Sequence, residues 1–192
     1  MTPLARDILD FWFGPPPHAA RAEWFRKDSA FDTTIRSRFG DAIEAALGSK
    51  LSGALHEGGG DSHAALAHVL LLDQFTRNAF RDTPRAFAGD GEALAIAIAA
   101  VDAGLDRTLD HCERWFLYMP FEHSENLAMQ DRSIALFTRL ADDKGDAALL
   151  EWAEKHAAIV RRFGRFPHRN AILGRASTPE EIAFLQEPGS RF

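Results

Sequence analysis

Helix signals recur along the whole chain, whereas the alternation of apolar and polar residues that marks a β-strand is nearly absent. Thr2-Pro3 is a typical helix start, because threonine caps the first turn and proline fits its first position. Thr178-Pro179-Glu180-Glu181 repeats this pattern and adds the glutamate of a capping box. Between these starts, apolar residues follow one another at intervals of four: Phe31, Ile35, Phe39, Ile43 and Leu47. The pattern predicts an all-α protein.

Short segments rich in proline and glycine separate the expected helices, and none is long enough to divide the chain into domains. We therefore predict one domain over residues 1–192, with about eight or nine helices packed as antiparallel hairpins. Pro120 is expected to end one helix, Ser124 to cap the next and Asp146 to cap the one after it. Gly58-Gly59-Gly60 predicts a flexible loop. The main helices are expected at residues 3–13, 28–47, 64–80, 90–103, 110–119, 124–140, 146–163 and 179–187.

The formal net charge of −6, from 28 acidic and 22 basic residues, disfavours nucleic acid and anionic membranes as partners. Cys112 is the only cysteine, so an intrachain disulfide is excluded. The longest apolar run, Ala93–Val101, is far shorter than the roughly 20 residues of a membrane span. The N-terminal residues lack the apolar core of a signal peptide, and a cytoplasmic location is therefore predicted.

The first of three polar segments, Asp73–Asn78, lies inside an apolar helix. Asp73 and Arg77 are four residues apart and share a helix face, as do Gln74 and Asn78. Polar groups in such a buried helix must be paired, or they destabilise the fold. An internal ion pair explains this segment as well as a functional site does.

The second polar segment, Pro120–Glu125, stands at an expected helix start, where free N–H groups favour an anion. His123 is a candidate general acid or base, because its ordinary pKa is near neutrality. Glu125 is a candidate partner that orients the histidine. Helix capping explains Ser124 and Glu125 fully, but it does not explain His123.

The third polar segment places five arginines and a histidine within the fifteen residues Arg161–Arg175. Gly164 and Pro167 indicate a turn that can direct several donors to one point. Arginine recognises carboxylate and phosphate groups in a bidentate manner, so the segment predicts an anion site. Stabilisation of a helix C-terminus is the alternative, and it accounts for Arg161 and Arg162 better than for the residues beyond the helix end.

No metal and no cofactor are expected. The sequence contains no HExxH motif, no Cys/His zinc spacing and no phosphate-binding glycine loop. The arginines would repel a cation from the eligible ligands, which are His123, His156, His168, Glu122 and Glu125.

Five motifs, in this order and spacing, resemble the bacterial family known as domain of unknown function 924. They are DFWF at 10–13, LDQFTRN at 72–78, YMPFEHSE at 118–125, RFGRFPHRNAILGR at 162–175 and STPEE at 177–181. The resemblance covers nearly the whole chain, and residues 162–181 are its most specific part. It implies a single all-helical domain of the tetratricopeptide-like, superhelical type, and it implies no particular activity, substrate or cofactor.

The preferred hypothesis is a site that binds, or also transforms, an anionic small molecule. His123 or His168 would move a proton, and Asp73 or Glu125 would orient its partner. The anion would be held by residues of the first and third segments: Arg77, Asn78, Arg165, Arg169, Asn170 and Arg175.

Two other hypotheses use the same residues. An interaction module of stacked helical hairpins would bind an acidic peptide or protein in an open groove. A purely structural, buried ion-pair network would use Asp73, Glu122 and the arginines to fix the fold, and removing one partner would then mainly destabilise the protein. The sequence determines neither whether the three segments meet in space nor the oligomeric state.

Overall fold

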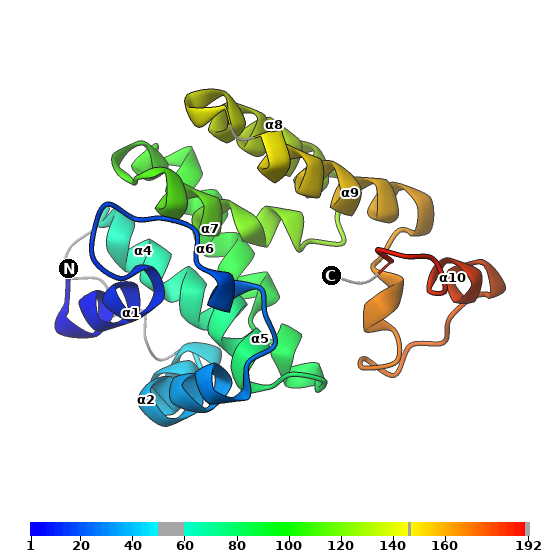
Figure 1. The fold of residues 1–192 in the computed structure, drawn as a ribbon, viewed down its shortest axis with the longest axis horizontal. Helices are drawn as coiled ribbons and strands as arrows, with labels where there is room; N and C mark the ends of the chain where they lie inside the picture. The colour runs from blue at the N-terminus through cyan, green and yellow to red at the C-terminus, as the bar shows by residue number, and fades with distance from the viewer. Residues whose placement is uncertain (50–59, 146, 191–192) are drawn as a thin grey trace. The chain divides into compact units, whose positions relative to one another are not determined.

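The computed structural model describes residues 1–49, 60–145 and 147–190, and every regular element in these ranges is helical (Figure 1). The predicted all-α class is therefore confirmed. Within the same ranges, no helix is long and apolar enough to cross a membrane. The expected loop at Gly58-Gly59 and the expected cap at Asp146 lie outside the described residues.

The chain divides into two compact units. The first contains residues 1–81 and 85–120, and the second contains residues 82–84 and 121–192. The single domain and the tetratricopeptide-like superhelix stay predictions.

The first unit is built around aromatic side chains. Trp12, Phe39, Phe75 and Phe116 are fully buried, and the rings of Trp12 and Phe116 meet edge to face with centroids 5.3 Å apart. The main helices of this unit are α1 (Pro3–Phe13), α2 (Ser29–Leu47), α4 (Ser62–Val69), α5 (Thr76–Ala79), α6 (Asp90–Asp102) and most of α7 (His111–Glu122). Between α4 and α5 lies the π-helical turn η2 (Leu70–Phe75), and the 3₁₀ turns are η1 (Ala22–Trp24), η3 (Pro84–Phe87) and η4 (Leu105–Thr108).

The π-helical turn is a departure from the uniform helix expected over residues 64–80. Thr76 donates its hydroxyl to the Leu72 carbonyl at 2.7 Å, and Arg77 donates to the Asp73 carbonyl at 2.6 Å. These side chains stabilise carbonyls at the place where the helical hydrogen-bond pattern changes. A Cβ atom on Gly89 would stand 2.3 Å from the carbonyl oxygen of Leu72. The backbone at Gly89 therefore lies so close to the π-helical turn that only glycine fits at this position.

Two of the expected helix boundaries were wrong. Helix α7 continues through Pro120 to Glu122, although proline lacks the N–H group for one hydrogen bond of the helix. Helix α8 (Leu127–Lys144) is capped by Asn126 and not by Ser124. The Asn126 side-chain oxygen accepts from the Ala128 and Met129 N–H groups, whereas the Ser124 hydroxyl accepts from Asn126 ahead of the helix.

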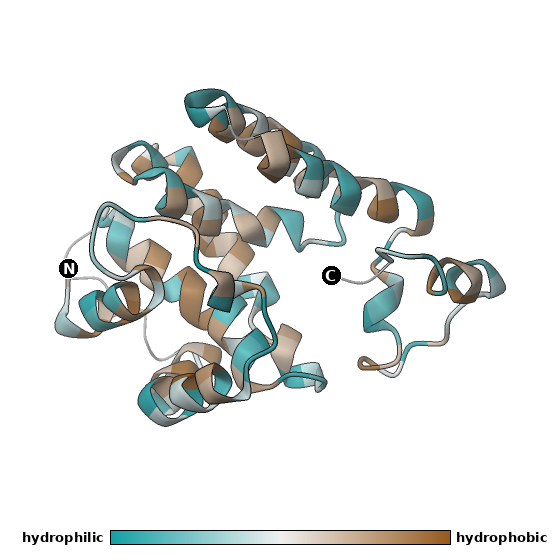
Figure 2. Cartoon of the chain, viewed as in Figure 1, coloured by the Kyte–Doolittle hydropathy of each residue, from teal (hydrophilic) through white to brown (hydrophobic). Residues whose placement is uncertain are grey.

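The second unit contains an antiparallel hairpin of α8 and α9 (Ala147–Phe163), which lie side by side in Figure 1. Both helices carry alternating hydrophobic and hydrophilic patches in Figure 2, as expected for helices with one buried face. The 3₁₀ turn η5 (Pro167–Arg169) follows, and the chain then enters α10 (Pro179–Phe184). The predicted capping box of Thr178 and Glu181 is confirmed.

Candidate functional site

The first polar segment forms a buried ion network inside the first unit. Asp73 is fully buried, and its carboxylate lies 3.0 Å from Arg77 and 2.6 Å from the Gln74 amide. Arg77 also meets both oxygens of Asp90, at 2.8 and 3.1 Å. Burial would lower the pKa of Arg77, but the two aspartates outweigh it and raise that pKa. Asn78 donates to the Asp32 carboxylate at 2.9 Å. These contacts match the structural alternative for this segment.

The second and third polar segments meet in the second unit through Glu125. Arg175 donates to both Glu125 oxygens, at 2.7 and 3.0 Å, in a bidentate pair. The Phe166 N–H donates to the same carboxylate at 2.7 Å. Burial would raise the pKa of Glu125, but the hydrogen bonds from Arg175 and Phe166 lower it overall. Residues 41 and 50 positions apart in the chain are thereby joined.

A second bidentate pair joins Arg165 to Glu181, at 2.6 and 2.8 Å. The hydrogen bond from Arg165 is the main cause that lowers the pKa of Glu181 to about 2. Asn170 links the two pairs, since its amide donates to Glu181 at 3.2 Å and its oxygen accepts from Arg175 at 3.0 Å. We call Arg165–Glu181 and Arg175–Glu125 the arginine clamps.

Beside the clamps, three side chains lie around the ring of Phe166, and two more lie against one of them, His156. We call them the histidine cluster: Glu122, His123, His156, His168 and Arg169.

The members of the histidine cluster come from four separate places in the second unit. Glu122 ends α7, His123 follows it, His156 lies on α9, and His168 and Arg169 lie on η5. The His156 and His168 rings lie 5.6 and 5.7 Å from the Phe166 ring, and the Arg169 guanidinium stacks 4.6 Å from its centroid. The His123 ring lies 6.2 Å from that of His156. Three imidazoles and a guanidinium therefore share one small volume.

His156 is the most perturbed group in the histidine cluster. Burial first, and then the positive charges of His123, Arg169 and His168, lower its pKa to about 3. His156 is therefore neutral at pH 7. Its Nδ1 lies 2.9 Å from the Trp152 carbonyl and 3.1 Å from a Glu122 oxygen. Because a carbonyl can only accept, Nδ1 carries the hydrogen and Nε2 keeps the lone pair.

The predicted site residues thus occupy three different environments. Asp73, Arg77 and Asn78 belong to the ion network of the first unit. Glu125, Arg165, Asn170 and Arg175 build the arginine clamps. His123, His168 and Arg169 lie in the histidine cluster.

The sequence predicts no functional role for two members of the histidine cluster: His156 is eligible there only as a metal ligand, and Glu122 only as a metal ligand or a member of a structural ion-pair network. They are 34 positions apart (156 − 122), so no local spacing connects them. One signal was present: a histidine on the buried face of a strongly periodic helix needs a polar partner.

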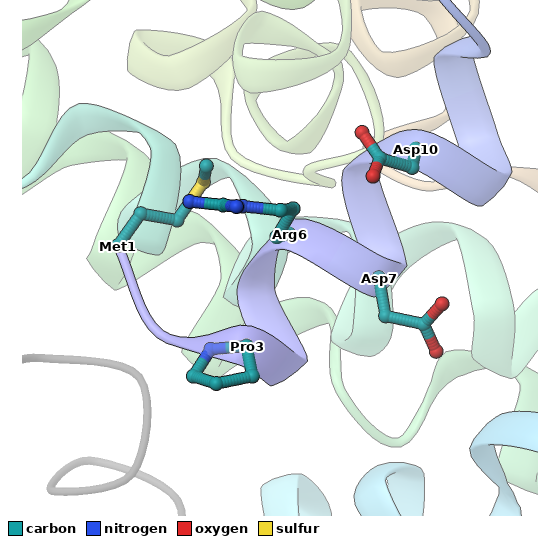
Figure 3. Close-up of a pocket in the computed structure, with 5 residues that line it drawn as sticks. All are labelled: Met1, Pro3, Arg6, Asp7 and Asp10. Carbon is teal, nitrogen blue, oxygen red and sulfur yellow. The ribbon is translucent and has the colours of Figure 1, made fainter.

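A hollow of about 350 Å³ beside α1 is a separate feature (Figure 3). It is lined by Met1, Pro3, Arg6, Asp7 and Asp10. The Arg6 side chain extends toward Met1, whereas the Asp7 carboxylate points away from it. None of the predicted site residues lines this hollow, and its charges are of both signs.

Comparison with known proteins agrees with the resemblance in the motifs. A protein of unknown function from Agrobacterium tumefaciens, ATU0120, has a similar solved structure with a TM-score of 0.83 and 44% sequence identity. The match covers 95% of this chain and 97% of that one. No curated protein matches the chain. The model of the family described as "Bacterial protein of unknown function (DUF924)" matches residues 8–189, and the chain therefore belongs to that family.

Proposed function

We propose that the histidine cluster binds a small molecule carrying a carboxylate or phosphate group. One observation carries the proposal: the Arg169 guanidinium and the His156 and His168 rings contact the Phe166 ring, and burial together with the neighbouring cations keeps His156 neutral. The field of these cations lowers the free energy of a bound anion in the same place. Arg169 is only 7% exposed, so this attraction is screened less by water and salt than on an open surface.

In this proposal the arginine clamps have a different task from the histidine cluster. Arg165 and Arg175 already hold carboxylates of their own chain, so a ligand would have to displace Glu181 or Glu125 to reach them. We propose that the clamps and Asn170 fix the loop that presents His168 and Arg169. The anion would then be held by Arg169, His168 and His123.

His156 supports a further step at the same site, in which the protein moves a proton. Its Nδ1–H faces the Trp152 carbonyl and the Glu122 carboxylate, which hold the ring in one orientation and tautomer. In this tautomer Nε2 is the basic nitrogen of the ring, the atom that would exchange a proton with a ligand in the proposed step. This arrangement suits proton transfer better than it suits an acidic peptide in an open groove.

The test is a thermal-shift titration of the full chain with inorganic phosphate, malonate, citrate and a short Asp/Glu peptide. At 100 times its dissociation constant, a ligand should raise Tm by about 5–10 °C. Arg169→Gln should abolish the shift, and His168→Gln should reduce it.

Arg161→Gln is the matched control, because it removes an arginine at an exposed position of α9. Equal weakening in Arg161→Gln would show a general charge effect, and no shift from any small anion would disprove the proposal. If Arg169→Gln does not fold, His168→Gln and Arg169→Lys still decide the result. A shift from the peptide alone would favour the interaction module instead.

A further inference from the structure

A second group of chemically reactive side chains lies in the first unit, at the N-terminus of α7. It contains His18 from the loop after α1, His63 from the first turn of α4, and Asp110 and Glu113 beside and within the first turn of α7. We call it the four-donor cluster. One ligand atom each from His18, Asp110 and Glu113 lies within 4.8 Å of the others. None of these residues belongs to the histidine cluster or to the arginine clamps.

The two carboxylates are held by reciprocal hydrogen bonds. One Asp110 oxygen, Oδ1, accepts from the Glu113 N–H at 2.9 Å, and Glu113 Oε2 accepts from the Asp110 N–H at 2.9 Å. This capping arrangement uses one oxygen of each carboxylate and fixes the direction of the other. The remaining oxygens, Asp110 Oδ2 and Glu113 Oε1, both face the imidazoles.

Two imidazole nitrogens lie beside these oxygens. His18 Nδ1 lies 2.7 Å from Asp110 Oδ2 and 4.0 Å from Glu113 Oε1. His63 Nε2 lies 3.3 Å from the same Glu113 oxygen. In a tetrahedral zinc site with bonds of about 2.1 Å, neighbouring donors stand roughly 3.4 Å apart. The observed separations lie on both sides of that value, so small adjustments of His18, Asp110 and Glu113 would bring these three around one ion. His63 lies outside this group of three and would turn inward from its place beside Glu113 to supply the fourth donor.

We propose that His18, His63, Asp110 and Glu113 form a binding site for a divalent transition metal ion, with Zn²⁺ as the best fit. Two nitrogen and two oxygen donors suit the borderline-soft character of this ion. Two carboxylates match its charge and offset the positive end of α7. The reciprocal hydrogen bonds are the kind of support that orients metal ligands, and the His18 ring also stacks on Phe13 with centroids 5.1 Å apart.

Burial shows how an ion would enter the four-donor cluster. Glu113 and His18 are 8% and 14% exposed, whereas His63 and Asp110 are 39% and 44% exposed. The buried pair would form the inner wall of the site and the exposed pair its entrance. A bound ion would join the loop after α1 to α4 and α7 within the first unit, so its expected role is structural.

The test uses full-length protein stripped of metal with a chelator and then titrated with Co²⁺ and Zn²⁺. Wild type should give the intense visible absorption of tetrahedral Co²⁺, and added Zn²⁺ should displace it. His18→Gln and Glu113→Gln should each weaken binding by about 10- to 100-fold. Glutamine at 113 retains an oxygen that can accept the cap hydrogen bond, so this variant should keep α7 intact.

The matched control is the double variant His123→Gln, His156→Gln, which removes two histidines from the other unit. It should leave the Co²⁺ spectrum unchanged. A spectrum lost in this double variant, or kept in His18→Gln, would overturn the proposal, as would weak octahedral absorption in wild type. Because this readout does not involve the histidine cluster, its failure would leave the anion proposal unaffected.

Discussion

The arginine clamps and the histidine cluster lie within a few residues of each other in the sequence, yet their electrostatics are opposite. In the clamps, bidentate arginines lower the pKa values of Glu125 and Glu181 and so stabilise the charged forms. In the histidine cluster, burial and neighbouring cations lower the pKa of His156 and so stabilise the neutral form. A local excess of arginine and histidine therefore does not by itself identify a binding site. Bidentate hydrogen bonds decide the charge state in the clamps, whereas burial is the first cause at His156.

The largest expected difference between the two regions is their response to acid. The pKa of His156 is about 3 in the folded chain and about 6.5 when unfolded. Between these values the unfolded chain binds a proton that the folded chain does not. The free energy of unfolding should therefore fall by about 1.4 kcal/mol per pH unit below pH 6.5, or about 3 kcal/mol at pH 4.5. Glu181 loses its contribution only between its ordinary pKa of 4.5 and about 2.

Urea unfolding of wild type and His156→Asn between pH 7.5 and 4.5 measures this response. Asparagine can keep the donation to the Trp152 carbonyl but does not titrate. The variant should lose most of the slope in this pH range, whatever its stability at pH 7.5. Equal slopes in the two proteins would mean that His156 is not held neutral in the folded chain.

The next largest expected effect is the loss of stability at neutral pH when one arginine clamp is broken. Glu181→Ala removes the partner of Arg165 and Asn170 and the carboxylate of the α10 capping box. We expect a loss of about 2–3 kcal/mol in the free energy of unfolding. The neighbouring variant Glu180→Ala breaks only an exposed pair with Arg162 and should cost less than about 0.5 kcal/mol. Similar losses in the two variants would contradict the structural role of the Arg165–Glu181 clamp.

The smallest expected effect is a shift in the pKa of His156 when a neighbouring positive charge in the histidine cluster is removed. The positive charge of His123 is one of the causes that lower the pKa of His156. His123→Gln should therefore move the His156 titration to higher pH, as followed by NMR of the imidazole signals. Arg162→Gln, at an exposed position near the end of α9, should leave that titration in place. An unchanged titration in His123→Gln would mean that burial alone sets the pKa.

The sequence predicted well those features that depend on neighbours in the chain. The caps at Thr2 and Thr178 and the all-helical class follow from local propensity, and all are confirmed. It failed at Pro120 and at Ser124, because the choice between adjacent caps depends on small differences among competing hydrogen bonds. It also missed the π-helical turn, which depends on how the side chains of Thr76 and Arg77 complete the local hydrogen bonding.

For the candidate site, residue types were predictable and pairings were not. The sequence identified the arginine-rich segment as a candidate anion site. It did not show that Arg175 and Arg165 bind Glu125 and Glu181 of the same chain, because these pairs connect distant positions. The pairing of His156 with Glu122 also requires α9 to pack beside the end of α7. Such contacts depend on tertiary packing, which periodicity alone does not encode.

The π-helical turn also determines where this helix can accept a change of length. Such a turn holds one residue more than an α-helical turn between hydrogen-bonded partners. Deleting one residue from Leu70–Leu72 can therefore convert the turn to an α-helical one and keep the residues that follow in register. The same deletion in the α-helical part, Ser62–Val69, would rotate everything before it by about 100° relative to Asp73 and Arg77. The segment that carries the Asp73–Arg77–Asp90 network is thus the place in this helix that tolerates a change of length best.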